Sequence, residues 1–127
     1  MIKPFEFYFD FISPYSFLAH KKIRIIEKKN SIKIKYKPIL LGGLHNLHSI
    51  KAPAFIPAKA KHMIRDCKLI AEENKIKFKF NSYFPIRSLN LMRGVIVAEE
   101  DNYKSHYIAG IFNAIWEDGL NMNDENV

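Results

Sequence analysis

The chain opens with phenylalanine at every second position from residue 5 to residue 11, with glutamate, tyrosine and aspartate between them. An alternation with a period of two is typical of a strand that buries at least one face. We therefore expect a first strand that starts near residue 5 and ends near Asp10.

A helix start follows this strand. Serine accepts hydrogen bonds from the free N–H groups of a first helical turn, and proline fits that turn because it has no N–H to lose, so the pair Ser13-Pro14 favours a helix. Apolar residues recur behind it at helical spacing, and lysines occupy the other side and the last turn. The pattern predicts a helix over residues 14–29 that stops at Asn30.

Isoleucine and tyrosine then alternate with lysine over residues 32–38, which predicts a second strand. Strand, helix and strand in this order form a βαβ unit, whose crossover is right-handed and whose strands are parallel. The lysines of this strand are expected to solvate its outer face.

The remainder of the chain changes to helical patterns. Residues 39–56 contain two adjacent glycines and a proline, which indicates a long irregular connection of the kind that is often functional. Residues 76–80 alternate like a strand, but their loop-like flanks favour an extended connector. Apolar residues at three-to-four spacing predict three helices, over residues 58–74, 89–100 and 103–118.

The end of the chain carries a further signal. Asn123, Asp124 and Glu125 are typical of a helix N-terminus, yet the sequence stops two residues later. A sheet of two parallel strands is also too small, because parallel sheets are normally buried on both faces. We expect an α/β fold in which residues 1–38 form a βαβ portion, residues 39–127 form a loop and a helical domain, and the C-terminal part of the sheet is missing.

The composition restricts the class of protein. The chain has 127 residues, a formal net charge of +7 and one cysteine, Cys67, which excludes an intrachain disulfide and makes a reducing, cytoplasmic setting the default. No apolar run approaches the roughly 20 residues of a membrane-spanning helix. The positive charge attracts anions in general, but the lysines lie within predicted elements, which favours a solvated surface over a nucleic-acid site.

Chemistry is expected at the junction between the first strand and its helix. The free N–H groups and the positive dipole end of a helix stabilise a nearby anion, so a thiolate placed there is favoured over its thiol. This segment contains no cysteine. A thiol would therefore come from a ligand, with the Ser13 hydroxyl donating a hydrogen bond to it, unless Ser13 serves only as a helix cap. Asp10 either orients this loop or is a solvated carboxylate.

Other polar clusters are weaker candidates. His45, His48, His62 and Cys67 are the types of residue that bind zinc, but they lack finger-like ligand spacing, so we expect no metal site. Cys67 falls on the apolar stripe of its helix and is expected to be a small buried hydrophobe. The apolar stripe of the last predicted helix is expected to be core as well.

One family resemblance covers essentially the whole chain. Residues 7–19, FYFDFISPYSFLA, resemble the N-terminal motif of the 2-hydroxychromene-2-carboxylate isomerases, which are related to kappa-class glutathione transferases. Further similar stretches follow in the family's order: PILLGG at 38–43, KAP at 51–53, PAK at 57–59, RD at 65–66, FPI at 84–86, LMR at 91–93 and FNAIW at 112–116.

The resemblance implies a fold and a mechanism. Family members have a thioredoxin fold interrupted by a helical domain, and a serine replaces the redox cysteine of thioredoxin-like disulfide oxidoreductases. The resemblance therefore implies glutathione as the cofactor and Ser13 as the catalytic residue that activates its sulfur. In the implied isomerisation, the thiolate adds to a conjugated double bond of an aromatic carboxylate, the former double bond rotates, and elimination regenerates glutathione.

The resemblance also implies the remaining site residues. Glutathione would be bound by Ser13, Tyr15 and Pro53, and the aromatic carboxylate by Lys51, His45 and Phe84, with Lys61 or Arg65 as alternatives to Lys51. Neither a metal, a nucleic acid nor a membrane is an expected partner, and a homodimer is compatible with the resemblance.

Two alternatives stay open. A kappa-like glutathione transferase or peroxidase would use the same Ser13 with another acceptor. A non-catalytic fragment, or one that has to pair with a separate polypeptide, would bind no glutathione by itself. A disulfide oxidoreductase is disfavoured, because Ser13 and Ser16 occupy the positions where two thiols are required.

Overall fold

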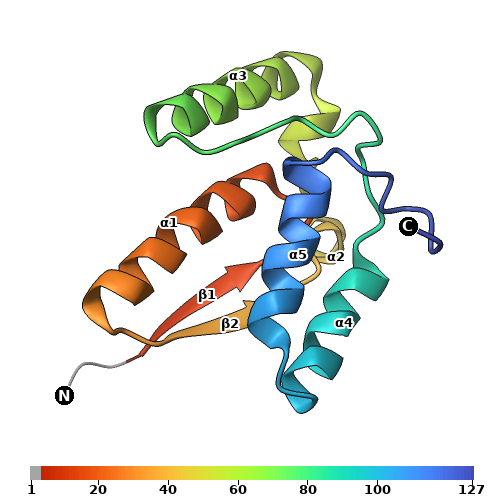
Figure 1. The fold of residues 1–127 in the computed structure, drawn as a ribbon. Helices are drawn as coiled ribbons and strands as arrows, with labels where there is room; N and C mark the ends of the chain where they lie inside the picture. The colour runs from red at the N-terminus through yellow and green to blue at the C-terminus, as the bar shows by residue number, and fades with distance from the viewer. Residues whose placement is uncertain (1–3) are drawn as a thin grey trace.

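The structure is a computed structural model that describes residues 4–127, and it begins with the predicted βαβ unit (Figure 1). A short helix, a 3₁₀ turn and three longer helices follow. The elements are β1 (Phe5–Phe9), α1 (Pro14–Asn30), β2 (Ile34–Pro38), α2 (Leu41–Leu47), η1 (Pro53–Phe55), α3 (Pro57–Glu73), α4 (Leu89–Glu100) and α5 (Lys104–Trp116). The three long helices predicted after residue 56 are confirmed to within a few residues at each end.

The two strands pair in parallel, as predicted, with Phe5 opposite Ile34 and Phe9 opposite Pro38. One face of this small sheet is packed against helices. Phe9 lies 5.8 Å from the Phe112 ring of α5, and Tyr36 lies 5.9 Å from the His20 ring of α1 (distances between ring centroids). The lysines of β2 alternate with these packed positions and are exposed, which confirms that they solvate the outer face.

The helix α1 forms where the sequence predicts it. The Ser13 Oγ accepts a hydrogen bond from the Ser16 N–H (3.1 Å), which caps the first turn. The helix ends at Asn30, and Ser31 then adopts a left-handed conformation with φ of 52°. Lysines at positions 28 and 29 lie in the last turn, where their charge complements the negative end of the helix dipole.

The helices α3 and α5 pack against α1, and α4 packs against α5. α4 and α5 lie side by side, and α3 packs beside the start of α1 (Figure 1). Gly94 allows the close approach of α4 and α5, because a Cβ atom at this position would collide with the Tyr107 ring. The Tyr107 hydroxyl donates a hydrogen bond to the Leu91 carbonyl across this contact (2.8 Å).

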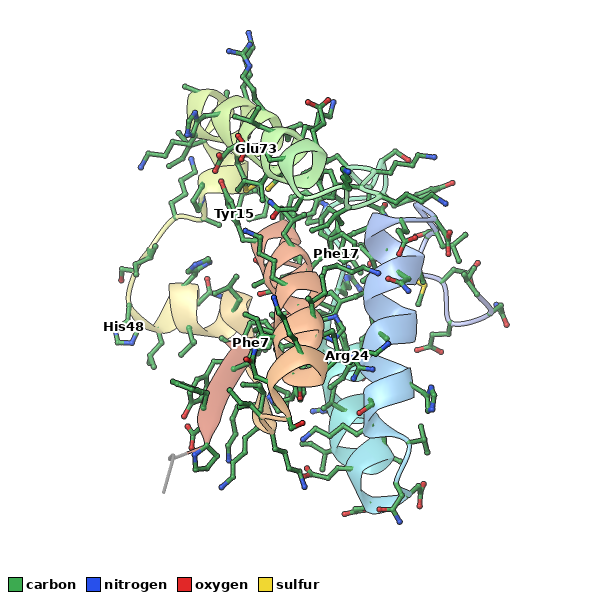
Figure 2. The ribbon with its side chains drawn as sticks, turned by 60° about the vertical axis from the view of Figure 1, so that its left-hand side comes forward. Phe7, Tyr15, Phe17, Arg24, His48 and Glu73 are labelled. Atoms are coloured by element: carbon green, nitrogen blue, oxygen red, sulfur yellow. The ribbon has the colours of Figure 1, made fainter. Side chains whose placement is uncertain are left out.

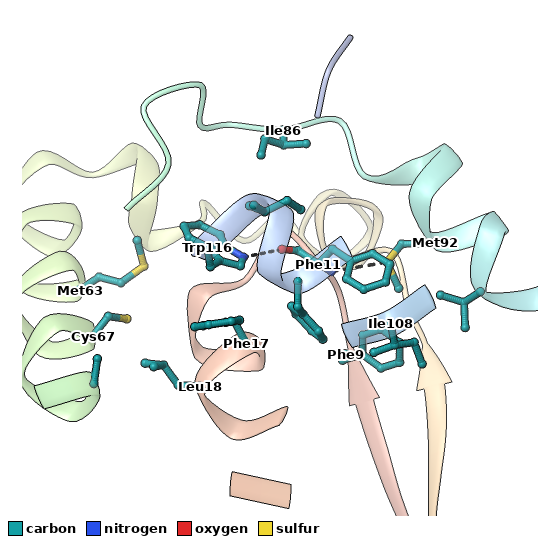
Figure 3. Packing of buried hydrophobic residues seen from close by; sticks show 14 residues of the cluster. Phe9, Phe11, Phe17, Leu18, Met63, Cys67, Ile86, Met92, Ile108 and Trp116 are labelled. Atoms are coloured by element: carbon teal, nitrogen blue, oxygen red, sulfur yellow. Dashed lines mark hydrogen bonds between the residues drawn. The ribbon is translucent and has the colours of Figure 1, made fainter. Parts of the chain in front are cut away.

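One hydrophobic core joins the βαβ unit to the helices (Figure 3). Phe11 and Phe112 lie 4.9 Å apart with their rings edge to face, and the Trp116 indole N–H donates to the Phe11 carbonyl (2.8 Å). The apolar stripe of α5 is therefore core, as predicted. Residues 4–38 and residues 39–127, which fall in the two predicted portions, share this core. None of the helices within residues 4–127 is long and apolar enough to cross a membrane.

The prediction of an irregular connection over residues 39–56 is wrong in part, because residues 41–47 form α2 and residues 53–55 form η1. Two glycines in a row disfavour a helix. A tertiary contact offsets this cost, since the buried Asp10 carboxylate accepts a hydrogen bond from the first amide of α2, that of Leu41 (2.8 Å).

The helix start predicted at residues 123–125 is also wrong, because residues 122–126 form turns. The Asn123 Oδ1 accepts a hydrogen bond from the Arg87 amide (2.8 Å) and so does not cap a helix. The connector at residues 76–80 is confirmed as extended chain without strand pairing. Its alternation arises because Phe78 and Phe80 pack on Trp116, at 6.1 and 5.5 Å between ring centroids.

Candidate functional site

The N-terminus of α1 carries two hydrogen-bond donors that have no acceptor within residues 4–127. The half-buried Ser13 accepts one hydrogen bond at its Oγ, from the Ser16 amide. A serine hydroxyl has one proton and two acceptor positions, so capping the helix leaves the proton free to donate. The Tyr15 amide has no acceptor among residues 4–127. An anion at this end would therefore meet an O–H and an N–H together with the positive end of the helix dipole.

Asp10 orients this loop, which decides between the two alternatives left open by the sequence. Its side chain is buried (1% exposed). One carboxylate oxygen accepts from the Ile12 amide (3.0 Å) and the other from the Leu41 amide (2.8 Å). The Asp10 backbone carbonyl accepts from the Ser13 amide (3.1 Å). The loop that holds Ser13 is therefore tied to the end of β1 by backbone and side chain alike.

Tyr15 forms one wall of an open hollow of about 380 Å³. Figure 2 shows Tyr15 near the start of α1, on the side that faces α3. Its hydroxyl donates to Asp66 on α3 (2.6 Å), and burial together with this hydrogen bond raises the pKa of Tyr15 far above its ordinary value. The hollow is lined by Tyr15, Pro53, Ala58, Lys59, His62 and Met63. The structure thus brings together two of the three residues predicted for glutathione, and Ser13 precedes Tyr15 by two positions.

The three residues predicted for the aromatic carboxylate do not line this hollow. Lys51 is exposed in the segment between α2 and η1, and His45 is half-buried on α2. Phe84 is half-buried and packs against Phe80 and Trp116, at 5.4 and 6.3 Å between ring centroids. Their roles in binding stay predictions.

The basic residues on the wall of the hollow are Lys59 and His62, which the sequence did not single out. Lys61 and Arg65, the alternatives named for substrate binding, are exposed on α3 but are not part of the lining. A three-residue spacing places Lys59 and His62 on one helix face, next to the buried Met63. That register was the signal available in the sequence.

A larger hollow of about 440 Å³ lies farther along α1, between Arg24 and Lys28. Arg24 follows Ser13 by eleven residues, which corresponds to roughly 16 Å along a helix axis. This hollow is therefore too far from Ser13 to share a small ligand with it.

Cys67 is not a nucleophile in this fold. Its side chain is buried on α3, as predicted, and burial raises the pKa of its thiol to about 12. A thiol with such a pKa is almost fully protonated near neutral pH. Within residues 4–127, no three or more histidine, cysteine, aspartate or glutamate side chains form a group that could hold a metal ion.

A parallel strand pair followed by helices, with a capped helix start at the end of the first strand, is the arrangement of a thioredoxin-like protein. Residues 5–127 match the family model of the DsbA-like thioredoxin domain, and the chain belongs to this family.

Similar proteins of known name indicate which members of this family the chain resembles. The chain is 26% identical to the 2-hydroxychromene-2-carboxylate isomerase of Sphingobium xenophagum over 128 residues, which cover 99% of this chain and 65% of that enzyme. It is 26% identical to the enzyme of the same name from Pseudomonas putida over 117 residues, covering 91% and 57%. It is 35% identical to glutathione S-transferase kappa 1 of Caenorhabditis elegans over 68 residues, covering 53% and 30%.

A solved structure agrees with the fold. The structure of a 2-hydroxychromene-2-carboxylate isomerase superimposes with a TM-score of 0.84 at 22% identity and covers 96% of this chain and 60% of that one. The resemblance seen in the sequence is therefore confirmed. The chain spans about two thirds, or less, of the length of these relatives.

Proposed function

We propose that this protein is a glutathione-dependent isomerase of an aromatic carboxylate of the 2-hydroxychromene-2-carboxylate type, with Ser13 activating the glutathione sulfur. The observation that carries this proposal is the Ser13 hydroxyl at the start of α1, which caps the helix as an acceptor and keeps its proton to donate, two residues before the Tyr15 that lines the hollow with Pro53. The names of the relatives that cover nearly the whole chain support the same reaction.

The residues of this chain have three tasks in the proposed reaction. Bound glutathione supplies the nucleophile, a thiolate that adds reversibly to the conjugated double bond, so that rotation and elimination give the isomer with no net redox change. The Ser13 hydroxyl donates a hydrogen bond to the sulfur and stabilises its negative charge. The Tyr15 amide and the dipole of α1 add to this stabilisation, which lowers the pKa of the bound thiol. The ring of Tyr15, held by Asp66, orients the ligand in the hollow.

The carboxylate of the substrate needs a cation near the hollow. Lys59 and His62 are on its wall, and Lys51 precedes the Pro53 that lines it. We assign the carboxylate to these side chains, with His45 and Phe84 contacting the aromatic part. The proposal includes the expectation from sequence that residues 39–127 form a loop and a helical insertion.

A kappa-like glutathione transferase is the second candidate. It is favoured by the 35% identity to the Caenorhabditis elegans protein, which is higher than that to either isomerase but covers 53% of this chain. The two activities share the activated thiol and differ in the acceptor. Isomerisation of a hydroxychromene carboxylate supports the first function, whereas conjugation of a halogenated arene without isomerisation supports the second.

The first experiment is a calorimetric titration of the 127-residue chain with glutathione. Saturable binding is expected, and its absence overturns both enzyme functions for this chain. Turnover is then compared between the wild type and Ser13→Ala. Losing a hydrogen bond to a charged sulfur costs about 1.5–3 kcal/mol, so turnover should fall by about 10- to 160-fold while the affinity for glutathione changes little.

Two further variants separate the roles of Ser13. Ser13→Asp keeps an acceptor for the helix cap but has no proton to donate. Its free energy of unfolding should therefore be close to that of the wild type, while it stays inactive. Ser16→Ala, one turn later, leaves the backbone donor of the cap in place and should keep full turnover. Full activity of Ser13→Asp would show that the serine is only a cap.

A further inference from the structure

Asp10 is a buried acid with no cation beside it. Its side chain is 1% exposed, and the two salt bridges within residues 4–127 join other residues, Lys21 with Glu117 and Lys104 with Glu99. A buried carboxylate without hydrogen bonds or a counter-charge is costly. The compensation at Asp10 comes from backbone amides, so its position depends on the two segments that supply them.

These two segments follow the two strands of the sheet. One is the loop after β1, where the Asp10 side chain accepts from the Ile12 amide and its carbonyl accepts from the Ser13 amide. The other is the start of α2 after β2, where the Leu41 amide donates to the second carboxylate oxygen. Because β1 and β2 are parallel, both segments emerge at the same edge of the sheet, and one carboxylate bridges them.

Apart from the Ile39 amide just before it, which donates to the Phe9 carbonyl of β1 (3.0 Å), the helix α2 has little else to hold it. None of its seven residues is buried, although all lie within the described chain, and Leu40 provides no side-chain cap. Figure 2 shows α2 pointing away from α1, with His48 at its outer end. The Asp10 carboxylate supplies both an acceptor and a negative charge at the first turn of α2.

We propose that Asp10 is a positioning residue of the site, which sets the Ser13 loop and α2 in register with each other through its two carboxylate oxygens. The inference rests on the proposed function as far as turnover is concerned. Ser13 then presents its hydroxyl to the bound sulfur in one orientation, and α2 brings His45 to the same edge of the sheet.

The test uses two variants that remove different parts of the bridge. Asp10→Asn keeps the shape but offers an NH₂ group to one of the two amides, so one bond is lost. Leu41→Pro removes only the N–H of the first residue of α2, where proline is tolerated. Leu40 before it already has the extended conformation that a following proline requires, with φ of −102° and ψ of 96°. Leu41→Ala and Asp118→Asn, at an exposed aspartate, are the matched controls.

The first readout is amide hydrogen exchange without glutathione. In Asp10→Asn, exchange should accelerate by at least tenfold at residues 11–13, at residues 41–45, or at both. In Leu41→Pro it should accelerate only at the residues of α2, and the two controls should match the wild type. Exchange in Asp10→Asn that equals the wild-type rate in both segments overturns the inference whether or not the chain binds glutathione.

The second readout is turnover with glutathione, expressed per folded molecule. A displaced hydroxyl should lower kcat of Asp10→Asn by about 10- to 100-fold with the affinity for glutathione within about threefold. Faster exchange with unchanged kcat shows a purely structural role and also overturns the inference. If Asp10→Asn does not fold, Leu41→Pro provides the exchange test of the bridge. A wild-type chain that binds no glutathione refutes the proposed function and leaves the exchange test of Asp10 intact.

Discussion

His20 makes the stability of this fold depend on pH. The side chain is 3% exposed and lies between the rings of Phe112 and Tyr36, at 5.1 and 5.9 Å between centroids. Its Nδ1 has no hydrogen-bond partner within residues 4–127. Burial, reinforced by the charges of Arg24 and Lys21, lowers the pKa of His20 from 6.5 to about 4. The folded state therefore holds the ring in its neutral form.

The size and sign of the effect follow from this shift. A pKa difference of one unit corresponds to about 1.4 kcal/mol. A His20 pKa of about 4 in the folded state against 6.5 in the unfolded state therefore changes the free energy of unfolding by about 3 kcal/mol. Between these two values the unfolded chain binds the proton that the folded chain excludes, so the free energy of unfolding falls as the pH falls. The contribution of His20 is fully present above pH 6.5 and is lost by pH 4.

The assay is urea unfolding of the wild type and of His20→Phe at a series of pH values from 7.5 to 4. Phenylalanine keeps the aromatic packing and removes the titrating group, so the difference in unfolding free energy should grow in its favour by about 2–3 kcal/mol toward pH 4. His106→Gln, at an exposed histidine of α5, should follow the wild-type curve. A difference between His20→Phe and the wild type that does not change with pH would refute the reasoning.

Two further predictions concern packing. Gly94→Ala should lower the free energy of unfolding by up to about 2 kcal/mol, because a collision with Tyr107 costs about 1–3 kcal/mol and the gain in helix propensity returns only about 1 kcal/mol. Gly110→Ala, at an exposed glycine with open space around it, should instead raise the free energy of unfolding. Equal midpoints of thermal unfolding for the two variants would contradict this prediction. The Cys67 thiol should react with a disulfide reagent at pH 8 only after unfolding in urea, because it is buried with a pKa of about 12; rapid labelling of the folded chain would contradict this placement.

Local patterns predicted the long elements correctly and the short ones poorly. The alternation in β1 and β2 and the helical spacing in α3, α4 and α5 extend over enough residues to identify each element. α2 was missed because its two glycines are typical of a loop and its stabilising partner, Asp10, lies 31 residues earlier in the chain. The turn at Asn123 was mistaken for a helix start because the same side chain can cap a helix or accept a hydrogen bond from the distant Arg87 amide.

The candidate site was predicted as separate residues and not as an arrangement. The motif around Ser13 marks the helix start, and the family resemblance groups Tyr15 with Pro53, which line one hollow in the structure. Lys59 and His62 were not singled out, since exposed basic residues are frequent in this chain and only the packing of α3 beside Tyr15 distinguishes these two. The burial of His20 was not predicted either, because a histidine that is followed by lysines on a helix gives no sign that it faces the core.

The amino-acid sequence by itself determined the βαβ unit, the capped start of α1, the apolar stripe of α5 and the family resemblance, because each depends on residues that are close together in the chain. Only the tertiary structure decided that Asp10 bridges two loops, that Tyr15 is held by Asp66, and that His20 is excluded from water. These properties depend on hydrogen bonds and burial between segments far apart in sequence, and no local pattern specifies which distant partner will be present.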